Sequence, residues 1–336
     1  MENTNLNIYP ITNGRIEVTD DNNNLISIDR VKTLINYVII QAQEVEVIPS
    51  ITLLGRKVIE NFDSFLLPII EYIETFDYGY SVIVESSGID LTEERLQVMR
   101  RKRITPVIKI NWALESGSLS EGFIDTVTNI INYFPSVSAE FKLTPQNISN
   151  LVSITATMKN LGIYNYRVSP DYFVEWNDND YSILESQIQQ IKDNAIQVFE
   201  EDDLPVLFED FISMFRKIVA IIGERQMNAD YRSIPMALAC NRCGMGVNGH
   251  VLIANNGDFH SCLRCKNNNF IIGNITDGVS NESVQNLIDS VNASSATGID
   301  CENCSLNRIC IGGCAVANFA VNGNTNYVTN VYCHWM

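Results

Sequence analysis

Short apolar runs rich in β-branched residues alternate with longer amphipathic stretches over residues 6 to 200. The short runs predict strands, and the stretches with apolar residues three and four positions apart predict helices. The expected strands are 45–53, 80–86, 104–111, 137–143 and 163–168, with a weaker one near 6–11. The expected helices are near 28–42, 60–76, 91–102, 118–134, 146–161 and 178–199.

This alternation predicts repeated βα units around a parallel sheet. Six units are too few for a closed eight-stranded barrel, so we expect an α/β fold with an open, partial (β/α)6 barrel over residues 1–200. Residues 201–239 begin with an acidic run and predict a linker with a bridging helix near 206–224. Residues 240–336 are rich in Gly, Asn and Cys, which predicts a small domain that metal holds together.

Charge and hydropathy narrow the classes of partner. The formal net charge of −17 would repel a phosphate backbone, so nucleic acid is not expected as a partner. No apolar run approaches the roughly 18 to 20 residues of a membrane helix, so a membrane is not expected either. The polar start of the chain, Met1–Asn7, lacks the pattern of a signal peptide, which predicts a cytoplasmic protein.

All nine cysteines fall in the last part of the chain. They are Cys240, Cys243, Cys262, Cys265, Cys301, Cys304, Cys310, Cys314 and Cys333. In a cytoplasmic protein, C-x2-C pairs usually bind metal. Thiolates this dense repel one another unless a cation shares them, and soft ligands of this kind suit iron–sulfur clusters or zinc.

The spacing resembles that of the SPASM domain, the auxiliary-cluster module of radical S-adenosylmethionine (radical SAM) enzymes that modify peptides. Cys243-x13-Gly257-x4-Cys262 is followed by C-x2-C-x5-C-x3-C and a last cysteine, and Gly312-Gly313-Cys314 is also similar to that family. The resemblance implies two four-iron four-sulfur clusters. One would take Cys301, Cys304, Cys310 and Cys333, and the other would take Cys243, Cys262 and Cys314 with Cys240 as the fourth ligand.

Cys265 leaves the first of these sites open. Cys240-x2-Cys243 together with Cys262-x2-Cys265 is also a zinc-ribbon spacing. Cys265 is therefore an alternative ligand, and zinc is the alternative metal at that site.

Residues 1–200 resemble the partial barrel of radical SAM enzymes, through phrases such as Val84–Gly88 and Leu143–Ile148. Those enzymes carry C-x3-C-x2-C just after the first strand, where this chain reads Ile11–Val18 without a cysteine. Their Gly-Gly-Glu-Pro falls on Gly55–Val58, so that Lys57 replaces the acid that pairs with the methionyl ammonium. The resemblance thus implies a pseudo-radical-SAM member, and S-adenosylmethionine is not expected as a cofactor.

The resemblance further implies a non-catalytic iron–sulfur partner or scaffold in the maturation of a ribosomally synthesised peptide. Its barrel mouth, with Gly14, Gly55, Gly88 and Trp112 at strand ends, would bind the precursor peptide or an active maturation enzyme. Two other functions stay open. One is a redox enzyme that uses only the two auxiliary clusters, and the other is a zinc-stabilised interaction protein.

Overall fold

The structure is a computed structural model of the 336-residue chain. It describes residues 10–114, 121–163, 165–200, 249–263, 266–292, 301, 303–304 and 312–335. The chain divides into two compact units, residues 1–135 with 243–290 and residues 136–242 with 291–336. The expected linker 201–239 and its helix lie outside the described residues. The division into 1–200, 201–239 and 240–336 therefore stays a prediction.

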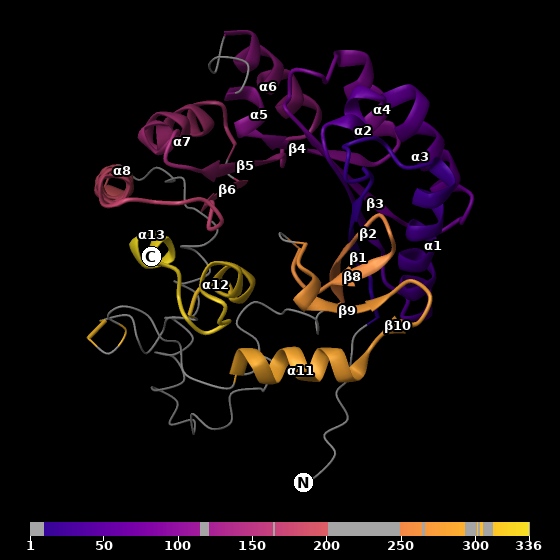
Figure 1. Cartoon of the computed structure of the whole chain (residues 1–336). Helices are drawn as coiled ribbons and strands as arrows, with labels where there is room; N and C mark the ends of the chain where they lie inside the picture. Colours follow the sequence, from indigo (N-terminus) through magenta and orange to yellow (C-terminus); the bar gives the residue numbers. More distant parts are fainter. Residues whose placement is uncertain are drawn as a thin grey trace, which may run out of the picture. The chain divides into compact units, whose positions relative to one another are not determined.

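A mostly parallel sheet organises the first unit (Figure 1). Its parallel strands lie in the order β7 (His250–Ile253), β1 (Asn13–Glu17), β2 (Ser50–Leu54), β3 (Ser81–Ser86) and β4 (Ile104–Lys109). Beyond β7, the sheet continues antiparallel with β8 (Asp258–His260), β9 (Ile271–Asn274) and β10 (Gly278–Val279). Because β7 pairs with β1, the polypeptide after residue 240 extends the sheet begun by the N-terminal residues.

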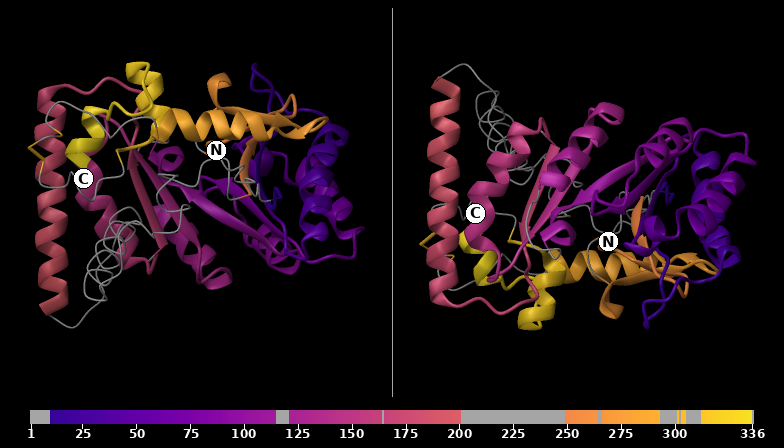
Figure 2. Two further views of the ribbon diagram at one scale, coloured as in Figure 1. Left: turned by 90° about the horizontal axis from the view of Figure 1, so that it is seen from below. Right: turned by 90° about the horizontal axis from the view of Figure 1, so that it is seen from above.

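Helices cover one face of this sheet, as Figures 1 and 2 show for α1 (Ile28–Glu44), α3 (Leu67–Glu74) and α4 (Glu93–Arg101). The Ser27 side chain begins α1 by accepting a hydrogen bond from the backbone N–H of Arg30. The other helical segments of this unit are α2 (Lys57–Glu60), the π-helical turn Phe62–Leu66, α5 (Ile110–Leu114), α6 (Glu121–Tyr133), the 3-10 turn Asn268–Phe270 and α11 (Asn281–Asn292).

The second unit pairs β5 (Ser138–Leu143) in parallel with β6 (Asn165–Pro170). Its helical segments are the 3-10 turn Ile148–Asn150, α7 (Leu151–Asn160), the long α8 (Asp178–Glu200), α12 (Ala315–Asn322) and α13 (Asn330–Trp335). Helix α13 packs against α8 and β6, and it contributes the buried Trp335 to the core. The end of the chain thus folds onto elements that precede residue 201.

The predicted strands 80–86, 104–111 and 137–143 match β3, β4 and β5, and the predicted helices overlap α1, α3, α4, α6, α7 and α8. The strand expected near 6–11 lies mostly outside the described residues, and its last residues, Pro10 and Ile11, are not in a strand. The stretch 11–18, expected to follow the first strand, is itself largely β1. The reason is its two-residue alternation, which buries Gly14, Ile16 and Val18 on one face.

This correction moves the loop after the first strand to residues 18–27. That loop also contains no cysteine. The absence of the three-cysteine motif therefore does not depend on where the first strand begins.

None of the described helices combines the length and the apolar composition that crossing a membrane requires.

Candidate functional site

A buried group of charged side chains lies on the sheet of the first unit and centres on Glu85 of β3. Its Oε1 accepts hydrogen bonds from Arg15 Nη2 of β1 at 3.1 Å and from Lys109 Nζ of β4 at 3.0 Å. Its Oε2 accepts one from the backbone N–H of Gly55 at 3.1 Å. The Glu85 side chain is only 9% exposed. We call Arg15, Glu85 and Lys109 the inner-face ion network.

Strand alternation places the network on the face of the sheet that is opposite α1. Arg15 pairs in register with Thr52, and Glu85 pairs in register with Val107. The neighbouring Ile16 is fully buried on the opposite face. Cations on two strands therefore converge on a carboxylate from a third strand.

Glu85 supplies the carboxylate that Arg15 and Lys109 share. Arg15 and Lys109 are partly exposed, at 18% and 22% of their side chains. The Nε–H of Arg15 is buried, and no described residue accepts a hydrogen bond from it. Leaving such a donor unsatisfied costs about 1–3 kcal/mol, so an acceptor that reached it would be stabilised.

Arg56, in the turn after β2, lies beside Trp112 of α5, the helix that directly follows β4. The Arg56 guanidinium carbon lies 5.2 Å from the centroid of the Trp112 ring, within the range of a cation–π interaction. Gly55, just before Arg56, has φ +106°, a backbone conformation that side chains with a Cβ rarely adopt. The predicted strand-end positions of Gly55 and Trp112 are confirmed.

Of the other two glycines expected at strand ends, one is confirmed and one is wrong. Gly88 follows β3 with φ +89°, and its N–H donates to Ser86 Oγ at 2.9 Å. Gly14 instead lies inside β1, paired with Ile51. A Cβ at Gly14 would lie 2.8 Å from a methyl group of Val38. The close packing of α1 on β1 leaves no room for a side chain at this position, and Gly14 does not belong to the strand-end site.

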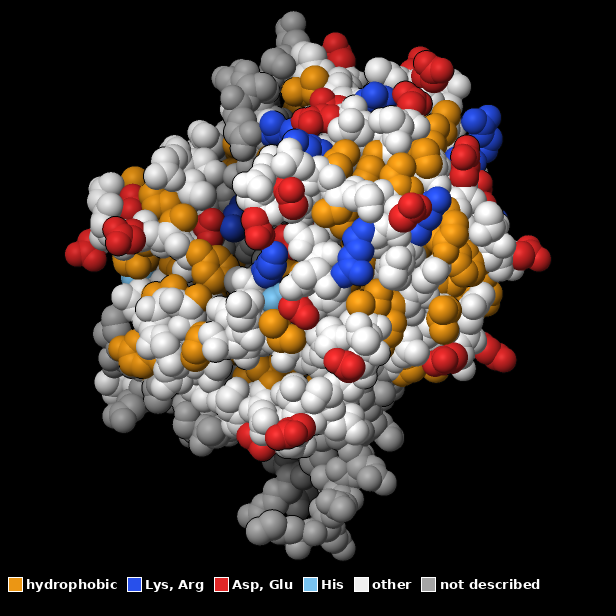
Figure 3. Space-filling model, turned by 45° about the vertical axis from the view of Figure 1, so that its right-hand side comes forward, with side chains coloured by type: hydrophobic (Ala, Val, Ile, Leu, Met, Phe, Trp, Pro, Cys, Tyr) orange, Lys and Arg blue, Asp and Glu red, His pale blue; other side chains and the backbone are white. Residues whose placement is uncertain are grey.

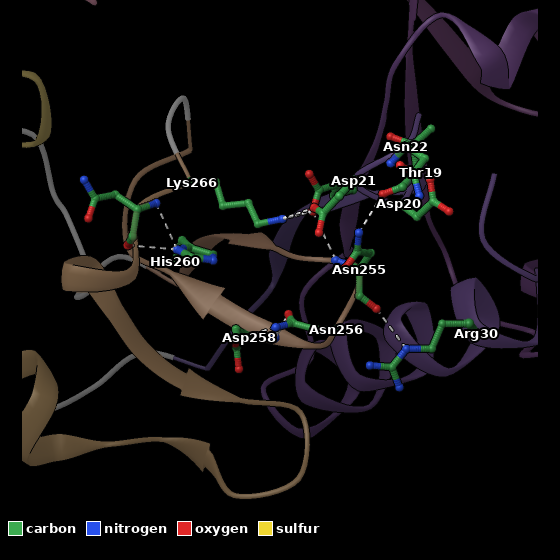
Figure 4. A network of polar contacts seen from close by, with 12 residues as sticks. Thr19, Asp20, Asp21, Asn22, Arg30, Asn255, Asn256, Asp258, His260 and Lys266 are labelled. Carbon is green, nitrogen blue, oxygen red and sulfur yellow. Dashed lines mark hydrogen bonds and ion pairs between the residues drawn. The ribbon is translucent and has the colours of Figure 1, made fainter. Parts of the chain in front are cut away.

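The hairpin β7–β8 is tied to the start of the chain by side chains from both (Figure 4). Asn255 in its turn donates a side-chain hydrogen bond to Thr19 O at 2.7 Å, and Arg30 Nε donates to Asn255 O at 3.0 Å. Lys266 pairs with Glu17 at 3.0 Å. These contacts hold residues on both sides of Cys262 against β1 and the segment that follows β1.

His260 lies within the same hairpin and is almost fully buried. Its Nδ1 lies 3.1 Å from the carbonyl oxygen and 3.3 Å from the backbone nitrogen of Asn267. Burial lowers the pKa of His260 below its ordinary value, so its imidazole is neutral at neutral pH.

Surface charge elsewhere is mixed. On the face drawn in Figure 3, acidic and basic side chains are interspersed with apolar ones. One exposed pair is Lys102 with Glu74, at 2.8 Å between Nζ and Oε2. The inner-face ion network differs from such pairs because its carboxylate is buried and shared.

The predicted metal ligands are described in part. Cys262 belongs to the first unit and is buried, whereas Cys301, Cys304, Cys314 and Cys333 belong to the second unit. The remaining four, Cys240, Cys243, Cys265 and Cys310, lie outside the described residues.

Within the described ranges, no three His, Cys, Asp or Glu side chains come together in a way that could hold a metal ion. Each predicted four-cysteine set has at least one member outside these ranges, Cys310 in one and Cys240 and Cys243 in the other. The support for iron–sulfur binding is therefore the chemistry of the donors, since thiolates are the ligands of these clusters. The ligand sets stay predictions.

Asn318 of α12 joins the segments that carry two of these cysteines. It is fully buried, and its Nδ2 donates to Gly312 O at 2.7 Å and to Thr325 O at 3.0 Å. Its Oδ1 accepts from the backbone N–H of Thr329 at 3.2 Å. Gly312 lies two residues before Cys314, and Thr329 lies directly before α13. The Asn318 side chain thus fixes the backbone next to Cys314 and the backbone just before α13, which carries Cys333.

Aromatic rings fasten α13, which carries Cys333, to α8. The ring of Tyr181 stacks on His334 with centroids 4.1 Å apart, and Trp176 lies parallel to Tyr181 at 6.4 Å. His334 Nδ1 lies 2.6 Å from Glu185 Oε1. The Cys333 side chain stays exposed beside this contact.

The sequence analysis missed Arg15, Glu85, Lys109 and Asn318. A signal existed for the first three, because each is a charged residue inside a short β-branched run. A charge on such a strand is buried or half-buried and needs a partner. Nothing in the local sequence marked Asn318.

No family model matches the chain, and no curated protein matches it.

Solved structures do match it. Native anSMEcpe with bound AdoMet has a TM-score of 0.67 at 11% identity, over 96% of this chain and 94% of that chain. Native anSMEcpe with bound AdoMet and Cp18Cys peptide has a TM-score of 0.68 at 11% identity, over 97% and 96%. Streptococcus suis SuiB bound to precursor peptide SuiA has a TM-score of 0.56 at 14% identity, over 97% and 76%. At these identities the likeness shows the fold alone, which is the α/β fold of the anSMEcpe and SuiB structures.

Proposed function

We propose that the chain is a catalytically degenerate radical SAM/SPASM protein that acts as an iron–sulfur partner or scaffold in the maturation of a ribosomally synthesised peptide. The observation that carries the proposal is a contrast between fold and sequence. The fold likeness extends over 96% of the chain, yet residues 1–239 contain no cysteine. Without three thiolates there, no cluster can pass an electron to S-adenosylmethionine.

The charges near the ends of β1 to β4 support the same conclusion. Lys57 begins α2, where the resemblance calls for a carboxylate that pairs with an ammonium group. Glu85 already accepts hydrogen bonds from Arg15, Lys109 and the Gly55 N–H. An incoming ammonium group would have to share Glu85 with these three donors and would be repelled by the two cations.

Peptide binding is supported by the neighbours, whose structures include anSMEcpe with Cp18Cys peptide and SuiB with precursor peptide SuiA. In this chain, the cation–π pair of Arg56 and Trp112 would contact such a peptide, because Arg56 directly follows β2 and Trp112 lies in α5 directly after β4. An aromatic ring under a guanidinium offers both apolar contact and hydrogen-bond donors.

The cysteines would hold the clusters, with Cys301, Cys304, Cys310 and Cys333 in one set. The other set is Cys243, Cys262, Cys314 and Cys240, with Cys265 as the alternative ligand and zinc as the alternative metal. Bound clusters would supply one-electron transfer or would cross-link the fold.

The test begins with anaerobically purified protein, S-adenosylmethionine and a strong reductant. We expect no 5′-deoxyadenosine above a control without protein, and its detection would refute the catalytic degeneracy. The scaffold role is tested by co-purification with a candidate precursor peptide and a candidate maturation enzyme. Arg56→Gln and Trp112→Ala should weaken that binding. Lys102→Gln should not, because Lys102 precedes β4 whereas Trp112 follows it.

Two outcomes would favour the other candidates. Stoichiometric zinc without sulfide would identify a zinc-stabilised interaction protein. Iron and sulfide with no binding of peptide or enzyme would favour a redox enzyme that uses only the auxiliary clusters.

A further inference from the structure

Exposed apolar side chains gather at the end of the first unit's sheet where β2, β3 and β4 begin. These three strands are parallel, so their first residues meet at one edge. The last part of α1 and the segment that leads into β2 expose Ile40, Val45, Val47 and Ile48. Ile48 is the most exposed of them, at 66%. Exposed apolar side chains that cluster within a polar rim are typical of a protein–protein contact.

Contacts between neighbouring strand starts make this surface continuous. The Tyr78 hydroxyl donates a hydrogen bond to Val47 O at 3.1 Å, which joins the segments before β3 and β2. The Tyr80 hydroxyl donates to Lys102 O at 3.0 Å, which joins the segments before β3 and β4. We call this region the strand-start surface, and it comprises residues 40–48, 77–80 and 100–103.

Charged side chains divide the strand-start surface into two halves. Exposed acids lie before β2 and β3, and exposed arginines lie before β4. The acids are Glu44, Glu46 and Asp77, and the arginines are Arg100, Arg101 and Arg103. Lys102 and Glu74 pair with each other at 2.8 Å, so their charges cancel. The surface thus carries opposite charges in balance, although the whole chain has a net charge of −17.

We infer that the strand-start surface binds a second copy of this chain in a two-fold dimer. A partner that covers it must be basic where this chain is acidic and acidic where this chain is basic. The same surface turned about a two-fold axis meets both demands, because each half then faces the other half of the second copy. A uniformly acidic partner would be repelled by the half with Glu46, and a uniformly basic partner by the half with Arg101.

This inference goes beyond the proposed function and does not depend on it. Arg56 and Trp112 follow β2 and β4, whereas the strand-start surface precedes these strands. A dimer formed through the strand starts would therefore leave the opposite strand ends open to a peptide.

The first experiment measures self-association of the full-length protein by sedimentation velocity at rising protein concentration. We expect the mass to move from monomer to dimer. Ile48→Asp should weaken the association by about tenfold or more, because the dimer would bury an unpaired charge. Ile89→Asp is the matched control. Ile89 is also an exposed isoleucine, but it follows β3, so its replacement should leave the association unchanged.

Charge reversal tests the two-fold pairing itself. Glu46→Lys gives the surface an excess of positive charge, and Arg101→Glu gives it an excess of negative charge. Each variant should therefore dimerise about tenfold more weakly than the unchanged protein. An equal mixture of the two variants should associate more tightly than either variant alone, because each supplies the charge that the other has lost. Recovery on mixing separates a lost contact from a misfolded chain.

A protein that stays monomeric at every concentration would overturn the inference. Dimers that persist unweakened in Ile48→Asp would place the interface elsewhere and overturn it too, as would a mixture no tighter than its separate components. If Ile48→Asp weakens co-purification with a candidate maturation enzyme while the protein remains monomeric, the surface belongs to that partner and the second copy is excluded. Dimers without any peptide binding would count against the proposed function alone.

Discussion

Arg15 and Glu85 lie 70 positions apart, and Nη2 of one lies 3.1 Å from Oε1 of the other across the sheet of the first unit. Lys109 completes the contact from β4. A buried carboxylate held by two cations constrains three strands at once. It also occupies the inner face of a sheet whose fold is shared with structures that bind AdoMet.

Removing the carboxylate should destabilise the protein. Glu85→Ala leaves Arg15 and Lys109 without their shared partner, and breaking a buried pair costs about 3–5 kcal/mol in the free energy of unfolding. Urea unfolding of the variant and the unchanged protein measures this. The control is Glu74→Ala at the exposed Lys102 pair, where the loss should stay below about 1 kcal/mol. Equal losses at the two sites would contradict the buried role of Glu85.

Asn318 should matter to both stability and metal content. Asn318→Ala removes three hydrogen bonds from the core, and each contributes about 0.5–1.5 kcal/mol to the free energy of unfolding. We expect a lower urea midpoint and less iron per chain in anaerobically prepared protein. Asn322→Ala is the control on the same helix, because Asn322 is exposed and donates a single hydrogen bond, to Tyr327 O. If the Asn318→Ala protein is destabilised but its iron content is unchanged, the hydrogen bonds of Asn318 do not affect metal binding by the cysteines.

Gly14 should tolerate no side chain while Val38 is present. Gly14→Ala places a Cβ 2.8 Å from Val38, and overpacking of this kind costs about 1–3 kcal/mol. The double variant with Val38→Ala should recover part of the loss, which a double-mutant cycle measures as a coupling energy. Gly79→Ala meets only ordinary contacts, with its closest atom 3.5 Å away, and serves as the control. Additive effects of the two substitutions would mean that another contact excludes the side chain at Gly14.

The metal content follows from the cysteine count. Two four-iron clusters require about eight irons and eight sulfides per chain, measured on anaerobic protein. Cys301→Ala and Cys304→Ala should each remove one cluster and destabilise the C-terminal segment, since metal binding and folding are coupled. Cys265→Ala should retain both clusters. Loss of a cluster in that variant would make Cys265 a ligand.

His250 should make stability depend on pH. Burial lowers the pKa of His250 in the folded state below its unfolded value of about 6.5. The unfolded chain then binds more protons as the pH falls, so stability is present above about pH 6.5 and declines below it. His250→Asn should flatten the dependence of the unfolding free energy between about pH 7 and pH 5. A remaining slope is expected from His260, whose pKa burial also lowers. An unchanged slope in the variant would exclude a contribution from His250.

The local pattern of the sequence predicted most of the elements. Strands β3, β4 and β5 and helices such as α1 were predictable because alternation and helical spacing are set by neighbouring residues. The absence of cysteine from residues 1–239 and the C-x2-C spacing are likewise properties of the sequence itself. These two features alone support the proposal of a degenerate barrel with a metal-binding C-terminal segment.

Only the tertiary structure decided which distant residues meet. Strand β7 joins β1 from more than 200 positions away, and Arg15 reaches Glu85 only because the register of three parallel strands aligns them. The alternation of a single strand says which residues share a face, but not which strand lies beside it. For the same reason the sequence placed Gly14 at a strand end. In the structure it lies inside β1, where α1 packs so closely that a Cβ would collide with Val38. Pairing between strands is a long-range choice made by the packed fold, so the ion network could not be read from any one segment.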